Sequence, residues 1–134
     1  MGYWAEFDAV NGLFRFTAEG RITDEVLLEG ITESRRFLAS HPGVRGICDF
    51  SQVTEFDVSS EGIRGLARSE SGAEADAVVI IVAPSDLMYG MSRMYSMLTE
   101  ERRPNRHVVR TMEEAYELLG VTSPQFVRVV GSSG

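Results

Sequence analysis

A nearly continuous apolar run at residues 76–83 constrains the fold of this chain more than any other feature. Its centre is Val78-Val79-Ile80-Ile81-Val82, a succession of β-branched residues. A strand that is apolar on both sides needs a covering layer on each face of its sheet, which is typical of a parallel strand packed by helices. The run is also much shorter than the roughly 20 apolar residues of a membrane-spanning helix. We therefore expect a buried strand here and no membrane span.

The segments around this run predict an α/β fold. Residues 3–18 alternate between apolar and polar side chains and predict a hairpin, with Asn11-Gly12 as a two-residue turn in which both residues have positive φ. Further strands are expected at 45–50 and 107–110, and helices at 24–41, 60–68, 85–102 and 112–119. A hairpin followed by βαβαβα predicts an α/β sandwich with a mixed, mostly parallel central sheet covered by helices.

The same pattern predicts the domain organisation. Residues 1–122 are expected to form a single domain, and residues 123–134 a C-terminal tail that is mobile from 131 onward. Within the tail, residues 126–130 have the sequence Phe-Val-Arg-Val-Val. They predict either an extra strand docked on the sheet or a segment that binds a partner.

Composition narrows the class of function. The chain has 134 residues and a net charge of −7, which disfavours nucleic acid because phosphate binding needs clustered cations. A single cysteine, Cys48, fits a reducing cytoplasm, and the N-terminus begins with a strand pattern where a signal peptide would be basic and then apolar. Neither His41 nor His107 lies in a ligand-spaced cluster, so we expect no metal and no cofactor.

Three motifs together resemble the STAS domain, the SpoIIAA-like fold of bacterial anti-sigma-factor antagonists. They are Gly-Arg-Ile-Thr at 20–23, the segment 49–60 with Asp-Phe-Ser at its start, and Val-Arg-Thr-Met-Glu-Glu-Ala at 109–115. The resemblance covers about residues 13–120. It implies a cytoplasmic, non-enzymatic module of bacterial regulation that binds an anti-sigma or kinase-type protein partner.

In that family an Asp-Ser-Ser-Gly turn follows the central strand, and a partner kinase phosphorylates its first serine. If Ser59 and Ser60 correspond to the two serines, both are candidate phosphoacceptors and Ser59 is the better of the pair. Val58 and Glu61 then replace the Asp and the Gly. If Asp57 corresponds to the Asp, the acceptor position is Val58, which cannot be phosphorylated. The partner-binding turn would comprise Asp49, Ser51, Asp57, Val58 and Arg64. A simpler explanation is that Asp57, Ser59 and Ser60 cap the following helix.

The helix expected at 85–102 is rich in methionine. Met88, Met91, Met94 and Met97 recur at every third position. We expect Leu87, Met91, Met94 and Leu98 to form its buried stripe. Gly90 weakens a helix unless something approaches it closely. The residues Met88, Tyr89, Gly90, Met91 and Met97 are therefore a candidate surface for an apolar ligand or for a homodimer.

Residues 89–95 of this helix also resemble a broader group of STAS-like proteins related to lipid carriers. The resemblance implies an alternative function, the binding of a small apolar or lipid-like ligand between the sheet and this helix. A carrier predicts a cavity of several hundred cubic ångströms, as is usual for ligand pockets. A partner-binding module predicts a filled core and an exposed turn at Ser59.

An enzyme is the third and weakest interpretation. Asp49 and Ser51 are expected to end the central strand, where α/β sheets often place ligands. A serine nucleophile also needs a base within reach, and no Gly-x-Ser-x-Gly elbow is present. A basic cluster at Arg102, Arg103, Arg106 and Arg110 is best explained as balancing nearby acidic residues and the preceding helix dipole.

Overall fold

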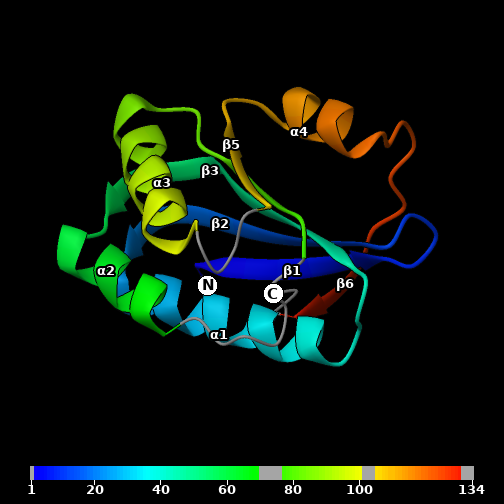
Figure 1. The fold of residues 1–134 in the computed structure, drawn as a ribbon, viewed down its shortest axis with the longest axis horizontal. Helices are drawn as coiled ribbons and strands as arrows, with labels where there is room; N and C mark the ends of the chain where they lie inside the picture. The colour runs from blue at the N-terminus through cyan, green and yellow to red at the C-terminus, as the bar shows by residue number, and fades with distance from the viewer. Residues whose placement is uncertain (1, 70–76, 101–104, 131–134) are drawn as a thin grey trace.

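The computed structural model describes residues 2–69, 77–100 and 105–130, and these form one mixed sheet with helices packed on it (Figure 1). The strands are β1 (Tyr3–Asp8), β2 (Leu13–Thr23), β3 (Arg45–Asp57), β4 (Val79–Val82), β5 (Arg106–Val109) and β6 (Val127–Val130). The helices are α1 (Asp24–Ala39), α2 (Ser60–Arg68), α3 (Asp86–Thr99) and α4 (Met112–Leu119).

The sheet has the strand order β5-β4-β3-β2-β1-β6. The pairs β2–β3, β3–β4 and β4–β5 are parallel, whereas β1 pairs antiparallel with both β2 and β6. In the β3–β4 pair, Ile47 lies opposite Ile80 and Cys48 opposite Ile81. The predicted α/β fold with a mixed, mostly parallel sheet is confirmed.

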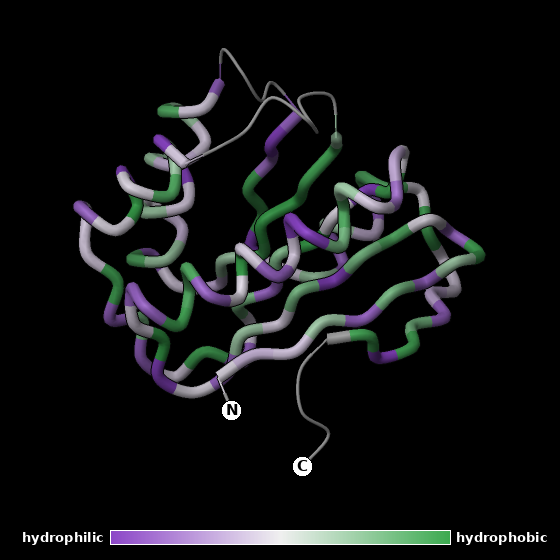
Figure 2. The backbone as a smooth tube through the Cα atoms, turned by 90° about the horizontal axis from the view of Figure 1, so that it is seen from below, coloured by the Kyte–Doolittle hydropathy of each residue, from purple (hydrophilic) through white to green (hydrophobic). Residues whose placement is uncertain are grey.

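Helices cover both faces of the strand at 79–82, as its apolar run predicts. Ile81 belongs to a core cluster with residues of α1, α2 and α3, whereas Ile80 and Val82 pack with Ala115 and Leu119 of α4. Hydrophobic and hydrophilic residues alternate along the helices in Figure 2, as expected for helices with one buried face. The predicted start of this strand at 76 lies outside the described residues.

The hairpin turn differs from the prediction. Residues 9–12 connect β1 to β2, and only Gly12 among them has a positive φ, at 65°. The buried Asp8 explains this longer turn, because its carboxylate accepts hydrogen bonds from the backbone N–H and side-chain amide of Asn11 at 2.9 and 2.7 Å. Asn11 therefore serves as a donor to Asp8, and the two-residue turn is not formed.

Strands β2 and β3 are longer than expected. The sequence pattern predicts the end of the central strand near residue 50, but β3 continues to Asp57 because β2 also continues beyond Ala18, as far as Thr23, and pairs with it. The prediction that Asp49 and Ser51 end this strand is therefore wrong. On the other side, β4 ends at Val82 opposite Asp49, so the extension of β3 has one strand partner.

The buried stripe of α3 agrees with the prediction only in part, because Met91 and Met94 are half-buried against the core but the other predicted positions are not. Met88, Ser92 and Thr99 are buried, whereas Leu87 and Leu98 are 58% and 47% exposed. The hydroxyl of Thr99 donates to the carbonyl of Tyr95 at 3.0 Å, which lets a polar residue occupy an inward position. An apolar pattern alone misses such positions. The described helix ends at Thr99, and the expected end near residue 102 lies outside the described residues.

The C-terminal segment adds β6 to the edge of the sheet, where it pairs with β1. Of the two alternatives predicted for residues 126–130, a docked strand and a partner-binding segment, the structure has the docked strand. Asp8 holds it by accepting the backbone N–H of Gln125 at 2.7 Å. Burial would raise the pKa of Asp8, but the hydrogen bonds from Asn11 and Gln125 outweigh it and lower the pKa below its ordinary value. Residues 131–134 lie outside the described residues.

Candidate functional site

The first candidate site is the start of α2. Ser59 is the N-cap residue, and its hydroxyl accepts the backbone N–H of Gly62 at 2.9 Å. The predicted capping role is therefore confirmed for Ser59. Ser60 is the first residue of the helix, and both serines are exposed.

An aspartate at the start of α1 holds Ser59. The backbone N–H of Ser59 donates to Oδ1 of Asp24 at 2.8 Å, and its hydroxyl donates to Oδ2 at 2.6 Å. A Cβ placed on Gly62 would lie 2.5 Å from Oδ1 of Asp24, so glycine is what allows the carboxylate to approach α2 this closely. Asp24, Ser59 and Gly62 thus form one contact between the starts of two helices.

Sequence reasoning missed Asp24 and Gly62 as site residues. Their contact arises because β2 and β3 are parallel neighbours with Thr23 opposite Asp57, so α1 and α2 begin side by side. Nothing in the spacing of Asp24 and Ser59 indicates this. The contact could have been predicted only from the register of β2 and β3, and the sequence pattern did not predict the extended parts of these strands.

The structure brings together only part of the predicted turn. Asp57, Val58 and Ser59 are consecutive at the end of β3, where Asp57 pairs with Arg21 and Val58 is buried. Arg64 is exposed on α2.

Asp49 and Ser51 lie further back along β3. Asp49 is buried, and its Oδ1 accepts the backbone N–H of the exposed Ser51 at 2.9 Å.

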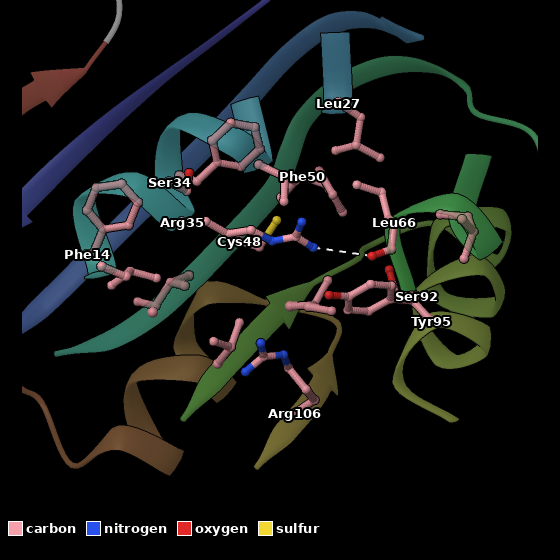
Figure 3. A pocket seen from close by; sticks show the side chains of 18 of the residues that line it. Phe14, Leu27, Ser34, Arg35, Cys48, Phe50, Leu66, Ser92, Tyr95 and Arg106 are labelled. Carbon is pink, nitrogen blue, oxygen red and sulfur yellow. Dashed lines mark hydrogen bonds between the residues drawn. The ribbon is translucent and has the colours of Figure 1, made fainter. Parts of the chain in front are cut away.

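The second candidate site is a cavity of about 120 Å³ between the sheet and the layer of α1, α2 and α3 (Figure 3). Its walls are mostly aromatic and aliphatic. The apolar lining comes from Phe14, Phe16, Leu27, Ile31, Leu38, Ile47, Phe50, Phe56, Ile63, Leu66, Val79 and Ile81. This cavity is smaller than the several hundred cubic ångströms expected of a carrier. It also differs from the filled core expected of a partner-binding module, so neither expectation is fully met.

Polar groups reach the cavity from three elements. Arg35 of α1 donates to the carbonyl of Leu66 at 3.3 Å and to the hydroxyl of Ser69 at 2.8 Å. Arg106 of β5 donates to the carbonyl of Ala77 at 3.2 Å. Ser92 of α3 also lines the cavity and is 5% exposed.

Cys48 lines the cavity as well. Burial raises the pKa of its thiol, the charge of Asp49 raises it further and Arg106 opposes the shift. Cys48 is therefore a neutral apolar wall residue at physiological pH.

The candidate surface on α3 is divided among different faces. Met88 is buried in the core, whereas Met97 is 67% exposed. Gly90 is exposed, with no described atom within 4 Å of the position that a Cβ would take, and the ring of Tyr89 lies 4.1 Å beneath the guanidinium of Arg110. The methionines are absent from the described cavity lining, to which α3 contributes Ser92 and Tyr95.

The basic cluster is also divided. Arg106 lines the cavity, whereas Arg110 pairs with Asp86 at 3.0 Å near the start of α3. Arg102 and Arg103 lie outside the described residues.

Neither a metal site nor a membrane span is found in the described part of the chain. No group of three or more His, Cys, Asp and Glu side chains among these residues is placed to hold a metal ion. Within the same ranges, no helix combines the length and the apolar character needed to cross a membrane.

The fold is thus an α/β sandwich with a helix-covered mixed sheet and an apolar cavity beneath three helices. No protein-family model matches the chain, and no curated protein matches it in sequence. Among solved structures it is similar to an uncharacterized protein of the DUF3478 family with a SpoIIAA-like fold from Shewanella loihica PV-4. That match has a TM-score of 0.52 and 17% identity, and it covers 80% of this chain and 83% of that chain. The predicted STAS-like, SpoIIAA-like fold is confirmed.

Proposed function

We propose that this chain is a non-enzymatic cytoplasmic protein that binds a small apolar ligand in the cavity beneath α1, α2 and α3. The observation that carries this proposal is the apolar cavity of about 120 Å³ inside the main core. Protein interiors are close-packed and contain few voids larger than a water molecule. An engineered cavity of about 150 Å³ with a comparable Leu, Ile and Phe lining binds benzene.

The free-energy cost of such a cavity supports a binding role. At about 24 cal/mol per Å³, an unfilled volume of 120 Å³ destabilises the fold by about 3 kcal/mol. That is a large fraction of the net stability of an ordinary domain. A ligand that fills the space would recover much of this free energy, and it would stabilise the folded chain by mass action.

The arrangement around Asp49 supports a function without catalysis. Its carboxylate accepts the backbone N–H of Ser51, which is a structural use of the group and does not activate the serine hydroxyl. His41 also has a structural environment. Its ring is stacked on that of Phe37 with centroids 4.0 Å apart, and its Nδ1 lies 2.9 Å from the backbone carbonyl oxygen of Phe37.

Benzene is the probe that tests the binding proposal. Titration of the full chain, followed by amide chemical shifts, should move signals from residues around the cavity and leave α4 unchanged. Cys48→Leu adds two heavy atoms to the cavity wall and should abolish the response, whereas the matched variant Cys48→Ala should retain it. Absence of any benzene-dependent shift in the unmodified protein would refute the proposal.

A second function is favoured by the exposed hydroxyl of Ser59. We propose that the start of α2 is a phosphorylation-controlled surface for an anti-sigma or kinase-type protein partner. Free N–H groups at a helix N-terminus can receive a phosphate. The same phosphate would stand beside the carboxylate of Asp24, which now accepts the Ser59 hydroxyl at 2.6 Å. Repulsion between the two would loosen the contact between α1 and α2.

Substitution at Ser59 tests this second function. Ser59→Asp should weaken binding to a partner captured from the native cell, and Ser59→Ala should retain it. Ser60→Ala is the matched control, because Ser60 is equally exposed but does not contact Asp24. If association is the same for all three variants, the regulated surface is not at Ser59.

A further inference from the structure

One buried hydroxyl in the cavity wall lacks a hydrogen-bond partner. Ser92 of α3 lines the cavity and is 5% exposed, and its hydroxyl makes no hydrogen bond within the part of the chain that the structure describes. Figure 3 shows its side chain on the inner side of α3, next to Leu66 and Tyr95. A hydroxyl that leaves water without gaining a new hydrogen bond costs free energy, so nearly all such groups in native proteins have a partner.

Two other buried hydroxyls show how this chain satisfies such groups. Ser34 of α1 also lines the cavity, and its hydroxyl donates to the carbonyl of Gly30 at 2.9 Å. Thr99 of α3 donates to the carbonyl of Tyr95 at 3.0 Å. Both acceptors lie four residues earlier in the same helix, which is a common use of serine and threonine in helices. Ser92 makes no such bond, so its hydroxyl is available to an occupant of the cavity.

The charged side chains of the wall are already engaged. Arg35 donates to the carbonyl of Leu66 at 3.3 Å, and Arg106 of β5 donates to the carbonyl of Ala77. We therefore assign neither guanidinium to the ligand. The rest of the described lining is mostly hydrocarbon and contains no Asp or Glu. A charged ligand would lose its hydration here without gaining a dedicated counter-charge, so the site favours an uncharged molecule.

We propose that the ligand is a small uncharged alcohol or phenol of about one ring, whose apolar body fills the cavity and whose hydroxyl pairs with that of Ser92. This inference rests on the proposed apolar-ligand function and specifies the chemistry of that ligand. The size follows from the volume of about 120 Å³, since an engineered cavity of about 150 Å³ holds benzene. A hydroxyl can donate or accept, so the pair can form in either direction.

Phenol and toluene are the probes that test the inference on the full chain. They are similar in size and differ in carrying a hydroxyl or a methyl group on the ring, and a phenolic group with a pKa of about 10 is uncharged at neutral pH. A cavity without a polar partner should select toluene, because the buried phenol hydroxyl would be unsatisfied. With Ser92 as its partner, phenol should bind at least as tightly as toluene in titration calorimetry.

A pair of serine variants separates recognition from packing. Ser92→Ala should weaken phenol binding about tenfold and leave toluene binding unchanged, because it removes one partner of a buried hydrogen bond. Ser34→Ala is the matched control, since Ser34 lines the same cavity and is 8% exposed but already donates to Gly30. It should leave the ratio of the phenol and toluene affinities unchanged.

Urea unfolding without ligand gives a second measurement. Ser92→Ala should leave the midpoint unchanged or raise it, because a buried hydroxyl without a partner is lost. Ser34→Ala should lower the midpoint, because a buried hydrogen bond is lost. A lower midpoint for Ser92→Ala would show that its hydroxyl already has a partner in the free protein, and the inference would be overturned.

The binding results distinguish failure of this inference from failure of the proposed function. If Ser92→Ala changes phenol and toluene binding equally, or changes neither, Ser92 does not recognise the ligand hydroxyl. The assignment is then overturned and the apolar-ligand function stands. The same conclusion follows if the unmodified protein binds toluene much more tightly than phenol. If benzene, toluene and phenol all fail to bind, both the assignment and the proposed function fail.

Discussion

The contact between α1 and α2 predicts that Gly62→Ala destabilises the protein when Asp24 is present and stabilises it when Asp24 is replaced by alanine. Replacing a helical glycine by alanine normally stabilises a helix by about 1 kcal/mol. At Gly62 the new Cβ would lie 2.5 Å from Oδ1 and 2.6 Å from Cγ of Asp24, so the carboxylate must move away. It would then lose its two hydrogen bonds to Ser59.

The expected magnitudes decide the sign. Hydrogen bonds to a charged group contribute about 1.5–3 kcal/mol each when buried, and the two at this partly exposed position are expected to contribute about 2 kcal/mol together. Gly62→Ala should therefore destabilise the protein by about 1 kcal/mol in the presence of Asp24. In the Asp24→Ala background the clash is absent, and the same substitution should stabilise by about 1 kcal/mol. The coupling free energy is then about 2 kcal/mol.

Urea unfolding of the four proteins of this cycle measures the effect as a shift of the midpoint at constant m-value. Gly65→Ala is the matched control on the same helix, because the nearest described atom to its new Cβ is Nη2 of Arg68 at 3.9 Å. It should stabilise the protein in both backgrounds. The reasoning is refuted if Gly62→Ala also stabilises the protein while Asp24 is present.

Three other predictions concern the core, the hairpin and α3. Cys48→Leu should raise the free energy of unfolding by up to about 1.6 kcal/mol, since it adds two heavy atoms to the buried wall of the cavity; a lower melting temperature than that of the unmodified protein would mean that the wall has no room for them. Asp8 has a folded-state pKa below the ordinary value of 3.8, so its stabilising contribution is present above that pH and is lost as pH falls through the folded-state pKa. The difference in urea stability between pH 7 and pH 3 should therefore shrink in Asp8→Asn, and an unchanged difference would contradict the role of Asp8. Gly90→Leu should disrupt a homodimer that packs on α3, which size-exclusion chromatography would show as later elution; an unchanged elution volume in a dimeric protein would exclude Gly90 from the interface.

Local chemistry explains why the helices could be located from the sequence. Thr23, Ser59, Ser85 and Thr111 each cap a helix by accepting a backbone N–H with the side chain. Such capping depends on residues within one turn, so the sequence alone indicates it. The apolar run at 78–82 likewise requires cover on both faces wherever the strand lies.

The missed features depend on contacts distant in sequence. Ser51, Gln52 and Glu55 of β3 are exposed and do not suggest a strand, yet pairing with β2 keeps this segment extended. Ser92 was missed because an apolar pattern assigns polar residues to the outside of a helix. The cavity depends on how side chains of α1, α2, α3 and the sheet meet, which no periodicity determines.

The two candidate sites share the same helices, and this makes them physically connected. α1 carries Asp24 at its start and Arg35 in the cavity wall, while α2 carries Ser59 at its cap and Leu66 in that wall. Loosening the Asp24–Ser59 contact would free the starts of both helices, and a ligand that packs between them would favour the arrangement in which the contact is formed. By linkage, the effect is reciprocal. Ser59→Asp should therefore weaken benzene binding although Ser59 is not among the described residues that line the cavity, and equal benzene affinities in the two proteins would show that the sites act independently.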